Sequence, residues 1–181
     1  MFVRSGLLEK FRLSELGSRT IGLRFPGEAI LPGDTPALYA IRALVDSEII
    51  IAPKQAVDDV VARFTDLATL FWKAADRYAV ITAEWLFNQS SKRASSRVAH
   101  LFCEIAWRSG SAPAFLLNPF TQRQVAPITG QTTVNVSRVI IELERIGVIS
   151  REGRNIIFHD WDDLCRLARF DYSYLQARSK D

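Results

Sequence analysis

The feature that most restricts the fold of this chain is a pair of short helix-like stretches joined at a glycine, within residues 121–141. Ala126 is small enough to lie where two helices touch, and Gly130 tolerates the positive φ that a tight turn between them requires. Three valines have the spacing of a shared buried face: Val125, Val136 and Val139. This arrangement predicts a helix-turn-helix.

The ends of the two helices show which side chains remain for binding. Thr121 can cap the first helix and Thr132 the second. The polar groups on the first turns of the second helix then occupy the place where a recognition helix meets base edges. We expect the motif to contact DNA through Thr121, Gln122, Arg123, Thr132, Thr133, Val134, Asn135, Ser137 and Arg138.

Three residues disagree with a standard helix-turn-helix. Pro127 falls inside the first helix, where it removes a backbone donor and should kink or shorten that helix. Thr129 and Gln131 occupy positions that normally point inward. A helical hairpin with no DNA role is the alternative, but the sequence that follows favours the helix-turn-helix.

That following sequence has the pattern of a wing. A strand ending near Ser150, a turn over residues 151–154 and a strand over 155–159 come directly after the second helix. Arg151 and Arg154 at the predicted tip would reach phosphates, or else are ordinary solvated turn residues. No Asp or Glu stands between Glu104 and Glu142, so phosphate can approach this stretch without repulsion.

The first part of the chain is strand-like. Residues 7–25 contain two such runs around a turn, which predicts a hairpin. The strand-like sequence already begins at the first residues, and few strands are available to cover one another. We therefore expect an N-terminal portion of this β unit to be missing from the chain.

A long helical region follows Pro53 and carries apolar residues at alternating spacings of four and three. This is the period of a coiled-coil seam, and its large aromatic residues favour a homodimer. The alternative is a helix packed on its own β domain. The seam, which stops at the polar segment from Asn88 that we interpret as a hinge, consists of Leu67, Phe71, Ala74, Tyr78, Ile81 and Trp85.

The expected fold class is α+β, with three parts. Residues 1–52 form a small, partial β unit, 53–92 a dimerisation helix and hinge, and 93–181 a winged helix-turn-helix domain.

Other classes of protein find little support. No apolar run approaches the ~20 residues that span a bilayer, so we expect a cytoplasmic protein without a membrane segment. Cys103 and Cys165 make no disulfide framework. His100 shares a helix face with Cys103, but a metal site needs more ligands. No nucleophile elbow or glycine-rich phosphate loop is present, so neither an enzyme nor a metal protein is expected.

The chain resembles the regulators of the cyclic-AMP receptor protein and fumarate–nitrate-reduction regulator superfamily, the Crp/Fnr family. The resemblance covers nearly the whole chain. The segments that show it are Val3-Arg4-Ser5-Gly6-Leu7 with Gly17-Ser18-Arg19, Phe25-Pro26-Gly27-Glu28, Arg42-Ala43-Leu44-Val45-Asp46, Arg97-Val98-Ala99-His100-Leu101 and the winged helix over 120–159. It implies that residues 1–52 are a partial effector-sensing β-roll, a jelly roll of the cyclic-nucleotide-binding-like type that lacks about its first third. It further implies a dimerisation helix and a winged helix that binds palindromic double-stranded DNA, with RNA polymerase as a further partner.

The chain departs from the family pattern in two ways. Gly27-Glu28 is not followed by the Arg-Ser or Arg-Thr pair of members that bind cyclic nucleotides, and the N-terminal cysteine cluster of the iron–sulfur branch is absent. We therefore assign no cofactor. Thr133 and Val134 stand where the cyclic-AMP-binding prototype has base-reading Arg and Glu, and only Arg138 matches in type, so an operator sequence cannot be transferred.

The resulting hypothesis is a homodimer that places residues 132–138 of each subunit in successive major grooves, with half-sites ~10 bp apart. Arg138 would read a guanine, Val134 would touch a thymine methyl, and Asn135 would bond a base or a phosphate. Residues 121–123 would hold phosphates. An alternative remains: a truncated DNA-binding protein that is independent of effector or pairs with an intact homologue.

Overall fold

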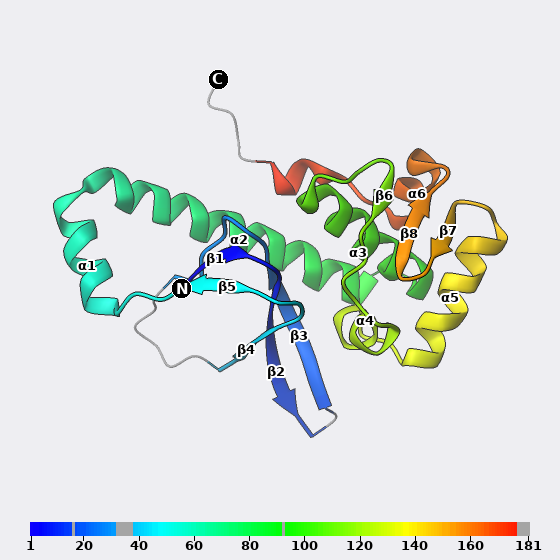
Figure 1. The fold of residues 1–181 in the computed structure, drawn as a ribbon, viewed down its shortest axis with the longest axis horizontal. Coiled ribbons are helices and arrows are strands. Elements are labelled where there is room, and N and C mark those ends of the chain that lie inside the picture. The colour runs from blue at the N-terminus through cyan, green and yellow to red at the C-terminus, as the bar shows by residue number, and fades with distance from the viewer. Residues whose placement is uncertain (16, 32–37, 92, 177–181) are drawn as a thin grey trace. The chain divides into compact units, whose positions relative to one another are not determined.

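The computed structural model describes residues 1–15, 17–31, 38–91 and 93–176. The chain forms two compact units, Met1–Ala83 and Glu84–Asp181 (Figure 1). The three-part division expected from the sequence stays a prediction, and its residues 16, 32–37, 92 and 177–181 lie outside the described part. The expected order of strands, a long helix and a winged helix is present.

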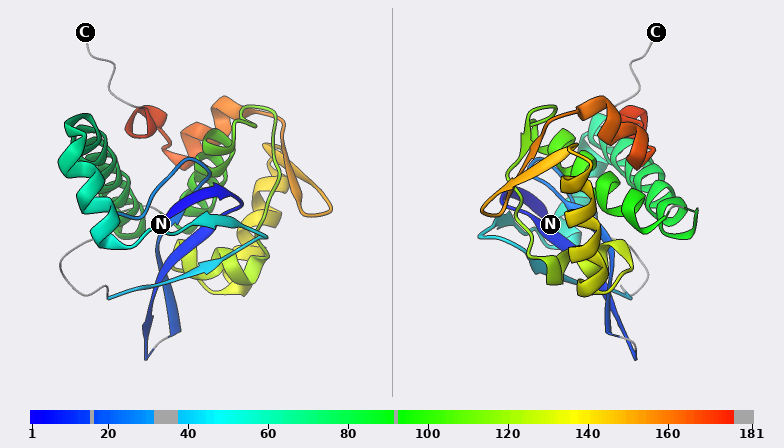
Figure 2. Two further views of the ribbon diagram at one scale, coloured as in Figure 1. Left: turned by 60° about the vertical axis from the view of Figure 1, so that its left-hand side comes forward. Right: turned by 90° about the vertical axis from the view of Figure 1, so that its right-hand side faces the viewer.

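The first unit begins with antiparallel strands. β1 (Phe2–Ser5) pairs with β5 (Glu48–Ile50), and β2 (Leu8–Ser14) lies between β3 (Gly17–Arg24) and β4 (Ala40–Ala43). The predicted hairpin is β2–β3, which extends well beyond β1 and β5 in both views of Figure 2.

Gly6 makes the corner between β1 and β2. Its φ is +89°, and a Cβ added there would lie 2.2 Å from Ser47 Oγ. That hydroxyl accepts a hydrogen bond from the Leu7 backbone N–H at 3.1 Å. Only glycine fits this close approach, because both the backbone conformation and the space exclude a side chain.

The core of the first unit contains a buried carboxylate among apolar side chains. Val3, Leu8 and Leu23 are buried. Glu9 is also buried, and it accepts hydrogen bonds from Thr20 and Arg42. These partners, on neighbouring strands, make the burial of the charge tolerable.

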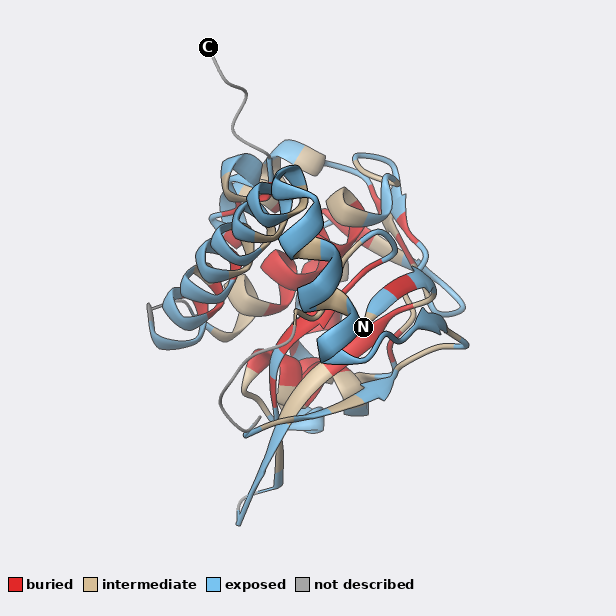
Figure 3. Cartoon of the chain, turned by 90° about the vertical axis from the view of Figure 1, so that its left-hand side faces the viewer, coloured by how far each residue is buried: buried red, intermediate tan, exposed pale blue. Residues whose placement is uncertain are grey.

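Two helices follow the strands. α1 (Lys54–Arg63) has no buried residue and is mostly exposed (Figure 3). The chain leaves helical geometry at Phe64 and resumes as α2 (Thr65–Ser91). The helical region expected after Pro53 is therefore two helices rather than one.

The second unit is built around α3 (Ala94–Ser109), whose residues 98–106 are all buried. α4 (Gln122–Thr129), α5 (Thr133–Arg145), α6 (Trp161–Ala168) and the 3₁₀ turn η1 (Tyr172–Leu175) pack against it. The strands β6 (Phe115–Leu116), β8 (Asn155–Phe158) and β7 (Ile149–Glu152) form an antiparallel sheet in that order. Helix-turn-helix and wing thus share one core.

Candidate nucleic-acid interface

Both helix caps predicted from the sequence are present. Thr121 Oγ1 accepts a hydrogen bond from the Gln124 N–H at 3.3 Å, and Gln124 Oε1 accepts one from the Thr121 N–H at 2.8 Å. Thr132 Oγ1 accepts from the Asn135 N–H at 3.2 Å. Gly130 ends α4 with φ +64°, as its place in the turn requires.

Pro127 does not interrupt the first helix, contrary to expectation. α4 continues through it to Thr129. The carbonyl left without an intrahelical donor is that of Arg123, an exposed residue four positions earlier. Thr129 is buried as its position suggested, and its hydroxyl donates to the Val125 carbonyl at 2.9 Å. The three discordant residues are therefore compatible with a helix-turn-helix.

The valines and Ala126 lie in the shared core, and the polar face points outward. Val125, Ala126, Val136 and Val139 are buried. The exposed site residues of the motif are Thr121, Arg123, Thr132, Thr133, Val134 and Arg138, while Gln122, Asn135 and Ser137 are half-buried. The structure therefore brings the first turns of α5 to the surface as one face.

An open depression of about 370 Å³ lies beside this face, lined by Arg97, Gly130, Gln131, Thr132, Val134, Asn135 and Arg138. Arg97 belongs to α3 and was not among the sequence-predicted site residues. No local pattern marks it, because it reaches the depression only through the packing of α3 with α4 and α5.

The wing is present, but its turn is shorter than expected. Gly153 and Arg154 form the turn, and Arg154 is exposed there. Arg151 lies in β7 rather than at the tip, so its predicted place is wrong. Its Nε and Nη2 donate to Glu144 Oε1 and Oε2, each at 2.7 Å. This bidentate pair lowers the pKa of Glu144 and ties the wing to the end of α5.

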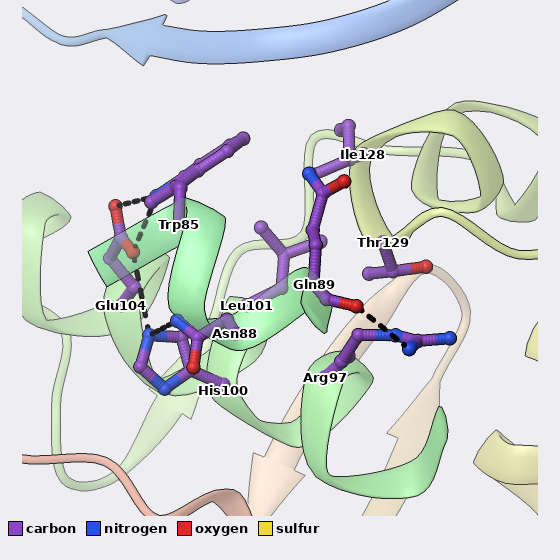
Figure 4. A pocket seen from close by; sticks show the side chains of 9 residues that line it. All are labelled: Trp85, Asn88, Gln89, Arg97, His100, Leu101, Glu104, Ile128 and Thr129. Atoms are coloured by element: carbon purple, nitrogen blue, oxygen red, sulfur yellow. Dashed lines mark hydrogen bonds and ion pairs between the residues drawn. The ribbon is translucent and has the colours of Figure 1, made fainter. Parts of the chain in front are cut away.

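A buried polar network lies behind the motif (Figure 4). Glu104 is 1% exposed and accepts hydrogen bonds from Trp85 Nε1 at 2.9 Å, Arg108 Nη1 at 2.8 Å and Tyr174 Oη at 2.8 Å. His100 Nε2 lies 2.7 Å from Asn88 Nδ2. Burial and the Glu104 charge raise the pKa of Tyr174, which keeps its hydroxyl a neutral donor. The adjoining cavity of about 30 Å³ has room for about one water molecule.

Two residues of the predicted dimer seam are instead used within the chain. The Tyr78 hydroxyl accepts from the Ala29 N–H at 3.1 Å, and the Arg24 guanidinium lies 3.9 Å from the Tyr78 ring centroid. Trp85 donates to Glu104. Ile81 is buried too, while Leu67, Phe71 and Ala74 are half-buried. For Tyr78 the alternative of a helix packed on its own β domain is correct, whereas Trp85 contacts α3 instead.

A second apolar stripe on α2 remains exposed. Trp72 is 76% exposed and Leu86 71% exposed. Helical periodicity places them on one side of α2 with Ala79, Ala83 and Phe87. Trp72, Ala79, Ala83 and Leu86 lie seven, four and three positions apart, so the sequence contained a coiled-coil signal for this stripe alongside that of the seam, although Asp76 interrupts it.

The two cysteines, 62 positions apart in sequence, are neighbours in the fold. Cys103 is fully buried on α3, and Cys165 is half-buried on α6. A hydrogen bond from Cys103 lowers the pKa of the Cys165 thiol. Within the described ranges, no group of three or more His, Cys, Asp or Glu side chains is placed to hold a metal ion. No helix among those residues is long and apolar enough to cross a membrane.

The fold and this surface define a winged helix-turn-helix domain joined to a small β unit and a long helix. The family model of the Crp-like helix-turn-helix domain matches residues 96–167. The winged helix-turn-helix part of the chain is therefore similar to the Crp-like helix-turn-helix domain.

Relatives in sequence and in structure agree with this assignment. A probable transcriptional activator of Rhizobium leguminosarum bv. viciae is 29% identical over 81% of the chain, and the transcriptional activator protein Anr of Pseudomonas aeruginosa is 26% identical over 92%. The chain spans 63% and 71% of the lengths of these two proteins. The structure of FixK2 from Bradyrhizobium japonicum, 20% identical, matches 92% of the chain and 85% of its own with a TM-score of 0.84.

Proposed function

We propose that this chain is a sequence-specific transcription regulator that binds a palindromic DNA operator as a homodimer. The observation that carries the proposal is the outward face of α5, where Thr133, Val134 and Arg138 are exposed beside Arg97. No carboxylate occurs between Glu104 and Glu142, so the face presents donors and cations without acidic neighbours in sequence. Such a surface suits a DNA groove.

Each exposed side chain has a role that its chemistry supports. Arg138 donates to the O6 and N7 of a guanine, a contact worth ~1–3 kcal/mol of discrimination. Val134, 70% exposed, touches a thymine methyl. Thr132, Thr133 and Ser137 bond nearby bases or phosphates. The remaining contacts, to phosphates, come from Thr121, Gln122 and Arg123 at the start of α4 and from Arg154 on the wing.

The dimer contact lies on the exposed stripe of α2 rather than on the predicted seam. Trp72, Ala79, Ala83 and Leu86 follow one another at the spacing of a coiled-coil core. Two copies of α2 that pair through these residues cover apolar area that is otherwise in water. A two-fold dimer of this kind places the two α5 helices ~10 bp apart on the duplex.

The setting of this function is transcription. The relatives are named transcriptional activators, which supports RNA polymerase as the second partner. Both proposed partners, DNA and polymerase, support a cytoplasmic location.

Selection of bound fragments from a random double-stranded DNA library, near physiological salt, tests the proposal. Enrichment of a two-fold palindrome with half-sites one helical turn apart is the expected result. Weak, salt-sensitive binding without an enriched sequence would contradict it.

Arg138→Ala then tests whether Arg138 contacts a guanine base. It should flatten the preference at one base pair per half-site, whereas equal weakening on every sequence would make Arg138 a phosphate contact. Arg145→Ala is the matched control, because Arg145 is also exposed but lies at the other end of α5.

A further inference from the structure

The side chains of Gln131 and Asn135 form a chain of hydrogen bonds at the edge of the recognition face. Gln131 Nε2 donates to the backbone carbonyl of Ala94, the first residue of α3, at 3.0 Å. Gln131 Oε1 accepts from Asn135 Nδ2 at 2.7 Å. This series of hydrogen bonds therefore runs from α3, through the turn of the helix-turn-helix, to Asn135 in the first turn of α5.

The chemistry of these groups fixes which way both amides point. A backbone carbonyl oxygen only accepts, so Gln131 must turn its amine toward Ala94. Its own oxygen then faces α5, and that oxygen also only accepts. Asn135 must therefore turn Nδ2 toward Gln131 and Oδ1 away from it. One backbone oxygen sets the orientation of two side chains.

This orientation leaves a defined edge of Asn135 available. Nδ2 carries two hydrogens, of which the bond to Gln131 uses one. Oδ1 accepts no hydrogen bond from any residue that the structure describes. Asn135 is half-exposed and lines the same depression as Val134 and Arg138. It therefore presents an acceptor and one remaining donor next to each other.

We propose that Asn135 forms hydrogen bonds with an adenine base and that Gln131 is the positioning residue that fixes the orientation of the Asn135 amide. This inference rests on the proposed function and adds a base and a second residue to it. Adenine presents the N6 donor beside the N7 acceptor in the major groove, which matches the free edge of Asn135. Guanine presents two acceptors, O6 and N7, so one of them would face Oδ1.

The same edge argues against a phosphate contact. Phosphate oxygens only accept, and Oδ1 stands beside the one N–H that remains. A phosphate near this edge would meet an acceptor as well as a donor. Of the two roles left open for Asn135 by the sequence, the geometry points to the base.

The test is DNA selection with the full chain and two variants of Gln131. The unchanged protein should enrich adenine at one position of each half-site by about 5- to 150-fold, the range of one bidentate contact. Gln131→Met keeps the length of the side chain but removes both hydrogen bonds, so this preference should fall toward equal use of the four bases. The guanine position assigned to Arg138 should persist, which shows within the same experiment that the variant is folded.

Gln131→Glu is the matched variant. It loses the donor to the Ala94 carbonyl, but a carboxylate only accepts, so it still turns Asn135 Nδ2 toward position 131. The adenine preference should therefore remain, while the added negative charge weakens binding to all sequences. Loss of the adenine preference in Gln131→Met together with its retention in Gln131→Glu supports the proposed positioning.

Three results would overturn the inference. If Gln131→Met still selects adenine, the hydrogen bonds through Gln131 do not determine which base Asn135 contacts. If Asn135→Ala weakens binding equally on all sequences, Asn135 contacts a phosphate. If the unchanged protein selects no sequence at all, the proposed function fails and this inference fails with it, whereas the first two results leave the guanine position and the proposed function intact.

Discussion

Removing one hydroxyl from the buried network should destabilise the second unit by a measurable amount. In Tyr174→Phe the ring keeps its place, but the donor to Glu104 Oε2, 2.8 Å away, is lost. Glu104 is 1% exposed, so water cannot readily replace that donor. The carboxylate then retains its bonds from Trp85 and Arg108 only.

The expected cost follows from the charge of the acceptor. A hydrogen bond to an ionised group contributes about 1.5–3 kcal/mol, more than one between neutral groups, and the buried acceptor would be left partly unsatisfied. We therefore expect a loss of about 2 kcal/mol in the free energy of unfolding.

Urea denaturation of the full chain, followed by circular dichroism, measures this loss. Tyr172→Phe is the control, since Tyr172 is 42% exposed and stacks on Trp107 through its ring, and it should change stability by less than about 0.5 kcal/mol. A Tyr174→Phe protein as stable as the control would refute the argument that the carboxylate depends on this donor.

Three further predictions concern other parts of the molecule. Trp72→Glu places a charge on the exposed stripe of α2 and should shift the protein from dimer to monomer in analytical ultracentrifugation without unfolding it; a dimer that persists would contradict the assigned interface. Arg151 lowers the pKa of Glu144, so this ion pair stabilises the folded protein fully above the ordinary pKa of the carboxyl, and the stabilisation is lost as the pH falls through the lowered pKa. NMR titration of Glu144 should show the lowered midpoint, and Arg151→Ala should restore the ordinary one. Gly6→Ala should destabilise the β unit by about 2 kcal/mol or more in thermal unfolding, because φ is positive and the space is occupied. Gly27→Ala, with similar φ but open space, should cost clearly less, and equal losses would show that space plays no part.

The helix-turn-helix could be predicted because its signals are local. The caps at Thr121 and Thr132 and the turn at Gly130 each depend on residues within four positions in the chain. The bond between Gln131 and Asn135 also has i, i+4 spacing, so the sequence contained a signal for it. Sequence reasoning gave Asn135 two possible roles because it treated the residue alone.

Which apolar face of α2 is used within the chain could not be chosen from the sequence. Both the seam and the exposed stripe follow a coiled-coil spacing. What distinguishes them is contact with distant residues, such as Tyr78 with Ala29 and Trp85 with Glu104. The position of Arg151 could not be predicted either, because it depends on how many residues form the wing turn.

The two neighbouring cysteines make the winged helix suitable for thiol-labelling kinetics. Cys165 is partly accessible and its pKa is lowered, so an alkylating reagent should modify it first. Cys103 has no exposed surface on α3, so its modification requires α6 to separate from α3. The rate of the second step therefore measures how often the domain opens locally. Operator DNA, if it binds only the closed domain, should slow that second step and leave the first nearly unchanged.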